Sequence, residues 1–404
     1  MLIQPDISCA NDTLHYVAGV FASVLPALFT AATVGLVALI AVQLGSTLQG
    51  ARRAALAFGL GTVAMVYART FYADPLLSLL VTGAVALTLT NALQKTLSAA
   101  LLAVLAVLAK PTGILLGPLL SLYLFLKKAS IRTALLPLAG SGLGLLCYCV
   151  YNFVRFGNPL NFGPANPFSM ALIPEGFAGQ LFSPGAGIIW YCPPVIMAVL
   201  GFSKAAKVRM MEAFLIASVF GAFLLLHSAV PYWEGGWSWG PRYLLPALPV
   251  IMALTGLLEG KAARIVLVLG LVGFLGNAPT LVSYYERYYA EALEQGISYK
   301  ALLWSPTRAP LVHGWGAAGR VIADARKNDV REMFREAGTP ATKIASSRAL
   351  RVVAVWWWVL PIVRIPRLVG ALTSAVMVFC GTWMIFRVKL PVHSDQLAET
   401  QSPP

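Results

Sequence analysis

The sequence predicts an all-α fold, a polytopic membrane helix bundle of about 11 spans with extracytoplasmic loops and a small extracytoplasmic helical segment. Of the 404 residues, 58% are hydrophobic and only 11% are charged. Soluble proteins carry about 25% charged residues, so this composition is typical of an integral membrane protein. The apolar residues form repeated runs, and the Lys and Arg residues stand in small groups between them.

The apolar runs give the candidate spans, because a helix needs roughly 20 apolar residues to cross a bilayer. Pro111 breaks one apolar stretch into two pieces, which could form a tight hairpin or one kinked element. In chain order, the predicted spans are residues 17–44, 54–72, 76–93, 97–109, 112–126, 133–153, 187–202, 210–230, 243–260, 264–282 and 368–388.

The basic residues predict the orientation of these spans. They fall in alternate short loops, and placing all of them inside satisfies the positive-inside rule. The N-terminus is then outside and the C-terminus inside. The residues concerned are Arg52, Arg53, Lys95, Lys127, Lys128, Arg132, Lys204, Lys207, Arg209, Lys261, Arg264, Arg387 and Lys389.

Most charged residues that could act in catalysis or ligand binding are then predicted at the outer face, while the inner loops are short and carry mainly the basic residues listed above. The working surface is therefore predicted to be extracytoplasmic. The outer charged residues are Asp74, Lys110, Arg155, Glu175, Glu234 and Arg242.

Three regions follow from this topology. Residues 1–282 form the multi-span domain, and residues 283–351 form a polar, helical segment that either caps the outer face or lies on the membrane surface. Residues 352–404 contain a Trp-rich interfacial stretch, the last span and a short cytoplasmic tail.

The net charge of +14 does not indicate a nucleic-acid partner, because the basic residues are scattered between apolar runs. The five cysteines show neither metal-ligand spacing nor a disulfide framework. We therefore expect a lipid bilayer as the surroundings and no nucleic acid as a partner.

Two short motifs place charges at the outer ends of spans. In "YARTFYADPLL", Arg69 either snorkels or binds substrate, and Asp74 either caps the helix that begins at Pro75 or binds substrate or metal. In "AKPTG", Lys110 either snorkels at a hairpin tip or binds an anionic group such as phosphate.

Two outer loops combine aromatic, glycine and charged residues. "YNFVRFGNPLNFG" contains Arg155 and reads either as an ordered loop or as the wall of a sugar-binding groove. In "PYWEGGWSWGPRYLLPALP", Glu234 and Arg242 either pair with each other or bind a polyol and an anion. The candidate ring-stacking residues of this stretch are Trp233, Trp237 and Trp239.

These motifs, in this order, resemble those of the GT-C glycosyltransferases, the group that includes protein O-mannosyltransferases and aminoarabinose transferases. "FYADPLL" resembles the Asp-Pro motif of that group, and "LAVLAKPTGILLGPLL" resembles the Lys/Arg-Pro segment that follows it. The loops at 151–163, 180–195 and 233–249 resemble loops of bacterial members. The resemblance covers roughly residues 17–310.

The resemblance implies transfer of a sugar, with inversion, from a polyprenyl-phosphate carrier to a hydroxyl of a glycan, lipid or protein at the outer face of the bacterial inner membrane. A carboxylate takes the acceptor proton, and cationic groups, in some members with a divalent metal, stabilise the phosphate. No metal ligand is assigned, and whether a metal is needed stays open. Asp74 and Glu234 are the expected catalytic carboxylates. The expected substrate-binding residues are Arg69, Lys110, Arg155, Trp233, Trp237, Trp239 and Arg242.

The predicted topology departs from the family pattern at the N-terminus. In the family, a first span leads from a cytoplasmic N-terminus to an outer loop that carries the catalytic Asp. Here the chain is predicted to begin outside, so this span and much of the loop are expected to be missing. Asp6 and Asp12 stand where the loop would be, and Asp12 is a third candidate catalytic residue.

Two other functions remain open. A transporter or flippase for lipid-linked glycans would be expected to show internal repeats and charges at mid-membrane depth, whereas the charges here gather at one face. A non-catalytic subunit of a glycan-assembly complex, or a glycan polymerase, would fit the same topology.

Overall fold

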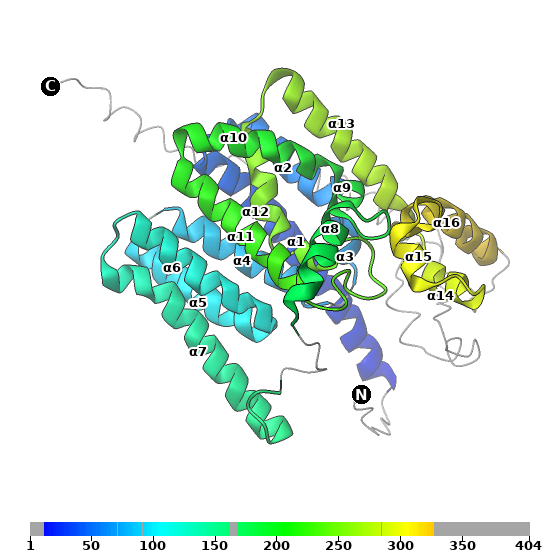
Figure 1. Cartoon of the computed structure of the whole chain (residues 1–404), viewed down its shortest axis with the longest axis horizontal. Helices are drawn as coiled ribbons and strands as arrows, with labels where there is room; N and C mark the ends of the chain where they lie inside the picture. The colour runs from blue at the N-terminus through cyan, green and yellow to red at the C-terminus, as the bar shows by residue number, and fades with distance from the viewer. Residues whose placement is uncertain (1–11, 71, 91, 162–167, 284, 327–404) are drawn as a thin grey trace.

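The computed structural model describes residues 12–70, 72–90, 92–161, 168–283 and 285–326, and these residues form sixteen α-helices joined by short 3-10 segments and loops (Figure 1). The predicted all-α class is confirmed for this part of the chain. The helices of the first half are α1 (Asp12–Gln43), α2 (Leu48–Gly61), α3 (Ala64–Tyr67), α4 (Asp74–Thr88), α5 (Leu93–Ala109), α6 (Leu116–Leu126), α7 (Ile131–Phe156) and α8 (Ile173–Phe182). Those of the second half are α9 (Ile188–Tyr191), α10 (Ala198–Val208), α11 (Met210–Ser228), α12 (Leu248–Ala253), α13 (Gly260–Asn277), α14 (Glu286–Glu294), α15 (Tyr299–Trp304) and α16 (Pro310–Arg326).

Four described segments are long and apolar enough to cross a membrane: Val24–Gln43, Ile131–Phe156, Met210–Ser228 and Gly260–Leu281. These segments are largely exposed. In each of them, only 28–44% of the most apolar 18-residue stretch is buried inside the protein. Exposed apolar surface of this kind fits contact with lipid tails. These four segments indicate an integral membrane protein, and the count of about eleven spans stays a prediction.

Three predicted spans are interrupted. Residues 54–72 contain the end of α2, a break at Thr62 and the short α3. Residues 187–202 hold α9, a 3-10 segment from Pro193 to Met197 and the start of α10. Residues 243–260 hold only α12 between two 3-10 segments. Prolines explain the last two breaks, because a proline inside a helix removes a hydrogen bond and clashes with the preceding turn.

The chain turns back on itself at Pro111, so a tight hairpin, rather than one kinked helix, joins α5 to α6. A 3-10 segment, η1 (Pro111–Leu115), forms the bend. Gly113 lies against α5 so closely that a Cβ atom there would stand 2.4 Å from the carbonyl oxygen of Ala106. Both α5 and α6 also pack against α7, which follows them along the bundle (Figure 1).

Helices α2 and α13 touch backbone to backbone. A Cβ atom on Gly61 would lie 2.7 Å from the Cα of Gly270, and one on Gly273 would lie 2.0 Å from the carbonyl oxygen of Gly61. Small residues allow this close approach in membrane helix pairs. Beyond the end of α2, Arg69 donates a hydrogen bond to the carbonyl of Thr280, which follows α13.

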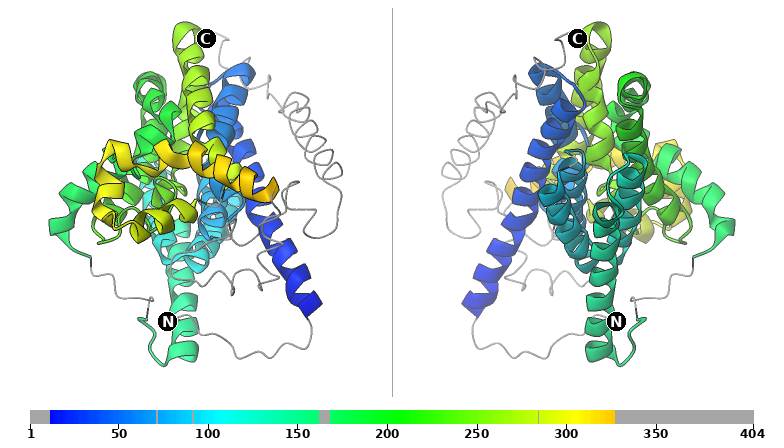
Figure 2. Two further views of the ribbon diagram at one scale, coloured as in Figure 1. Left: turned by 90° about the vertical axis from the view of Figure 1, so that its right-hand side faces the viewer. Right: turned by 90° about the vertical axis from the view of Figure 1, so that its left-hand side faces the viewer.

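The described part of segment 283–351 consists of α14, α15 and α16, which lie across one face of the bundle (Figure 2). The helical structure predicted for this segment is confirmed for its described residues. Residues 327–351 lie outside the described residues. The Trp-rich stretch 352–363 and the span 368–388 lie outside the described residues. In both views of Figure 2, the start of α1 and the end of α7 project from the same end of the bundle.

Candidate active site

Asp74, Lys110 and Arg242 come together although they are far apart in the sequence. Lys110 Nζ lies 2.7 Å from Asp74 Oδ1, and Arg242 Nε lies 3.8 Å from Asp74 Oδ2. The Asp74 side chain is 4% exposed, that of Lys110 23% and that of Arg242 14%. One nearly buried carboxylate is thus shared by two cations that keep some access to solvent, so the cluster has a surplus of positive charge.

Local structure explains how the helices deliver Asp74 and Lys110. Asp74 is the first residue of α4, and Pro75 follows it in the first turn, where a missing N–H costs nothing. The interpretation of Asp74 as a helix cap is wrong, because the cap position is Ala73 and no side chain caps it. The Asp74 carboxylate is instead turned to Lys110, the residue at which α5 ends before Pro111.

A glycine-containing turn holds Arg242. Gly235 and Gly236 both have positive φ, 90° and 75°, a conformation that favours glycine. The turn exposes the carbonyl of Gly235 to Arg242, whose Nη2 donates a hydrogen bond to it at 2.8 Å. The predicted pairing of Arg242 with Glu234 is not found among the described ion pairs, where Arg242 pairs with Asp74.

Aromatic rings cover both cations. The Arg242 guanidinium lies 4.3 Å from the centroid of the Tyr72 ring, and Lys110 Nζ lies 4.6 Å from that of Tyr243. The Tyr243 ring also lies 5.3 Å from Arg242. Cation–π contacts of this kind stabilise positive charge away from water. Burial opposes the charge of Arg242, but Tyr67 and Asp74 more than offset it and raise the pKa of Arg242, which stays a permanent cation.

His227 forms the inner side of the cluster. Its ring stacks on Tyr243, with centroids 4.5 Å apart, and it lies within electrostatic range of Lys110 and Asp74. Nδ1 is 2.9 Å from the carbonyl oxygen of Phe223, which can only accept, so Nδ1 carries the proton. Nε2 therefore has a free lone pair, and it is buried with no hydrogen-bond partner among the described residues.

Glu234 stands one residue before the carbonyl that holds Arg242. It is buried, and the hydroxyl of Tyr299 lies 3.2 Å from its Oε1 and 2.7 Å from the carbonyl of Gly236. Burial raises the pKa of Glu234, and the nearby Glu175 adds to the increase, while contacts with Tyr299 and backbone groups oppose it. A carboxyl group with a raised pKa is suited to proton transfer.

The three candidate ring-stacking tryptophans have protein partners already. Trp239 is 1% exposed, and its indole N–H donates to Asn277 at 2.8 Å. Trp233 is 5% exposed and packs against Trp304. Trp237 is only partly buried and stacks on Tyr289. These contacts hold the 231–242 loop in place. Of the three rings, that of Trp237 is the most accessible to a ligand.

The remaining predicted residues lie apart from the cluster. Arg69 bonds to the carbonyl of Thr280. Arg155 is exposed near the end of α7, where its Nη1 lies 2.5 Å from the hydroxyl of Tyr151 and its guanidinium faces Phe156. Asp12 is the first residue of α1, and its side chain is outside the described ones.

The sequence reasoning missed three contributors: Tyr72, Tyr243 and His227. Tyr72 and Tyr243 are direct neighbours of predicted motif residues, so their place beside "ADP" and "GPR" was a usable signal. His227 interrupts the apolar run "FLLLHSAV", and an ionisable residue inside such a run is a functional candidate by itself.

The cluster carries one net positive charge and is therefore suited to bind an anion. Two cations flank one carboxylate, and a phosphate group would accept hydrogen bonds from both. Within the described residues, no group of three or more His, Cys, Asp or Glu side chains could hold a metal ion.

No family model, no curated protein and no solved structure matches this chain.

Proposed function

We propose that this protein is an integral membrane glycosyltransferase. It transfers a sugar from a polyprenyl-phosphate carrier to a hydroxyl of a glycan, lipid or protein at the extracytoplasmic face of the bacterial inner membrane. The observation that carries the proposal is the convergence of Lys110 and Arg242 on Asp74 at the ends of apolar helices. A phosphate on a lipid would meet two fixed cations there, next to the bilayer.

In the proposed reaction, the acceptor oxygen attacks the anomeric carbon of the sugar. A new carbon–oxygen bond forms as the bond to the phosphate oxygen breaks, and the polyprenyl phosphate leaves with the electron pair. Lys110 and Arg242 stabilise the growing charge on the phosphate, and Asp74 keeps both cations in position. Attack from the face opposite the leaving group inverts the configuration.

The proton of the acceptor hydroxyl passes to a base beside the cluster. Glu234 is one candidate, since its burial favours the protonated state that results from the transfer. His227 is the other, since Nε2 has a lone pair without a partner. Glu234→Gln and His227→Phe separate them, because each removes one acceptor and His227→Phe keeps a ring against Tyr243. The base is the residue whose loss lowers turnover while donor binding is kept.

The test uses the full chain in nanodiscs and a panel of radiolabelled polyprenyl-phosphate sugars. We expect turnover with one donor, and a loss of roughly 10²-fold or more in Arg242→Ala and Asp74→Asn. Arg132→Ala, which removes an exposed arginine at the start of α7, is the matched control and should keep full turnover.

Donor binding is measured in parallel. Binding without turnover in any condition would indicate a non-catalytic assembly subunit. Absence of both binding and turnover would contradict the proposal and favour a transporter, for which counterflow of a labelled lipid-linked glycan is the direct assay.

A further inference from the structure

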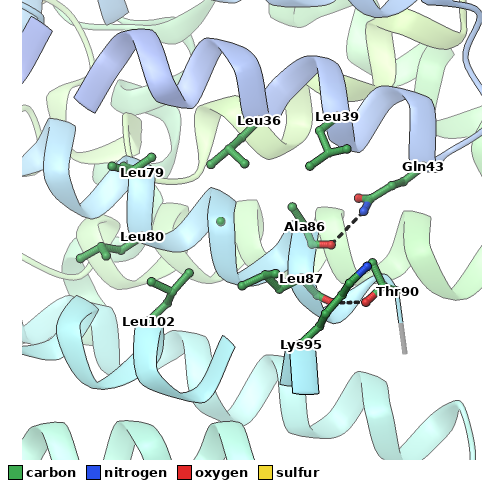
Figure 3. A pocket seen from close by; sticks show the side chains of 11 residues that line it. Leu36, Leu39, Gln43, Leu79, Leu80, Ala86, Leu87, Thr90, Lys95 and Leu102 are labelled. Carbon is green, nitrogen blue, oxygen red and sulfur yellow. Dashed lines mark hydrogen bonds between the residues drawn. The ribbon is translucent and has the colours of Figure 1, made fainter. Parts of the chain in front are cut away.

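An apolar groove lies between α1, α4 and α5 (Figure 3). Its volume is about 470 Å³, and six leucines line most of it: Leu36, Leu39, Leu79, Leu80, Leu87 and Leu102. Gly83 also lines the groove, and a Cβ atom there would lie 3.1 Å from a methyl group of Leu102. Leu39 and the neighbouring Leu101 on α5 are themselves exposed, so the groove opens among side chains suited to lipid.

One end of the groove is polar. Gln43, Thr90 and Lys95 line it there, as Figure 3 shows. Gln43 donates a hydrogen bond from Nε2 to the carbonyl of Ala86 at 3.0 Å, but its Oε1 is buried and has no partner among the described residues. A buried acceptor without a donor is costly, which indicates that a donor from outside the chain completes it.

Lys95 supplies an uncompensated positive charge at this end. It is exposed, and no described carboxylate lies within ion-pair distance of it. The groove thus combines an apolar channel with one cation and one unpaired acceptor. A molecule that fits has an aliphatic chain, a negative charge and a hydroxyl or amine donor next to that charge.

Lys95 and Lys110 lie too far apart to hold the same phosphate group. Lys95 lies near the start of α5, and Lys110 follows its end, fifteen residues later in the chain. At 1.5 Å per residue, the two cations are roughly 22 Å apart along the helix. A phosphate bound at Lys110 therefore cannot also reach Lys95.

We propose that this groove binds an anionic glycerophospholipid of the leaflet opposite the Asp74 cluster. An acyl chain fills the space between the leucines, the phosphate lies at Lys95, and a headgroup hydroxyl donates to Gln43 Oε1. The proposal does not depend on the reaction proposed above, since it concerns the other end of α4 and α5.

The test measures lipid retention by the purified full chain with native mass spectrometry in detergent. The probes are phosphatidylglycerol and phosphatidylcholine of identical acyl chains, added in turn. We expect the wild type to retain phosphatidylglycerol about fivefold better, the size of the attraction of one lysine to an anionic lipid surface. Lys95→Gln should abolish this preference, and Lys207→Gln, which removes an exposed lysine of α10, should leave it unchanged.

A second variant tests the groove itself. Leu39→Trp fills the opening from a partly exposed position, so the core of the bundle is left intact. It should reduce retention of both lipids, with an unchanged thermal midpoint in lipid-free detergent. Equal retention of the two lipids by the wild type would overturn the proposal. So would an unchanged preference in Lys95→Gln, or displacement of phosphatidylglycerol by an equimolar polyprenyl phosphate.

Discussion

The two ends of the α4–α5 pair differ in how their charges are compensated. At one end, Lys110 and Arg242 share Asp74, and aromatic rings cover both cations. At the other end, Lys95 stands beside an apolar groove with no described counter-charge. The same two helices thus end in a pre-organised cluster and in an incomplete one. In our two proposals, the first cluster binds the phosphate of the sugar donor, and the second binds a lipid that supplies the missing negative charge.

Removal of Asp74 should have the largest effect, because it removes the carboxylate that pairs with Lys110 and Arg242. Asp74→Ala leaves Lys110 and Arg242 close together with no carboxylate between them. Loss of one partner from a buried ion pair costs about 3 kcal/mol or more. We expect a clear fall of the thermal midpoint in detergent, together with loss of donor turnover. An unchanged midpoint would mean that the carboxylate does not hold the two cations.

Substitution of Arg242 by lysine should have the next largest effect. Lysine keeps the charge but loses the planar guanidinium that lies on Tyr72 and bonds to the carbonyl of Gly235. We expect turnover to fall about 10²-fold, since a displaced cation no longer meets the phosphate oxygen. Turnover equal to that of the wild type would show that charge alone is enough at this position, and Arg242→Ala measures the loss without any charge.

Glu234→Gln should change how the stability of the protein depends on pH. Burial raises the pKa of Glu234 in the folded protein, and its close titratable neighbours are Tyr299 and Glu175. A raised folded pKa contributes stability that is full below the unfolded value of about 4.3 and is lost as the pH rises through the folded value. The midpoint of the wild type minus that of the variant should therefore fall as the pH rises from 4.

The opposite trend, a difference that grows with pH, would show that Glu234 is held as a carboxylate. The measurement is a series of thermal scans of both proteins in the same detergent, between pH 4 and pH 8. Tyr299→Phe, measured alongside, reports how much of the trend depends on the hydroxyl contact.

Arg155→Ala should have the smallest effect. This arginine is exposed, and its polar and ring contacts among the described residues are with Tyr151 and Phe156 of its own helix. Exposed contacts of this kind contribute little, so we expect less than a twofold change in turnover and an unchanged midpoint. A large loss of turnover would place Arg155 at the substrate and extend the site to the end of α7.

Much of the fold and part of the cluster could be predicted from the sequence. The span predicted for 210–230 matches α11, because a long apolar run is a local signal. Six charged residues were predicted to share the outer face, and three of them, Asp74, Lys110 and Arg242, contact one another. The side of the membrane stays a prediction.

The rest depends on contacts between distant residues. Nothing near Trp239 in the sequence indicates that Asn277 accepts a hydrogen bond from it and encloses it. The same is true of Asp74. Its place before Pro75 suggests a helix cap, but its carboxylate pairs with Lys110, 36 positions later in the chain. Arg242 likewise finds the carbonyl of Gly235 only because two glycines there adopt positive φ.

The backbone contact between Gly61 and the α13 glycines has a mechanical consequence. At these glycines no side chain separates the two backbones, so sliding of one helix along the other would bring main-chain atoms into collision. Beyond these helices, Arg69 after α3 donates a hydrogen bond to the carbonyl of Thr280 after α13. Asn277, at the end of α13, accepts a hydrogen bond from Trp239, three positions before Arg242. We therefore expect α2 and α13 to move as one rigid unit. Spin labels on these two helices should keep a constant separation when a polyprenyl-phosphate sugar is added.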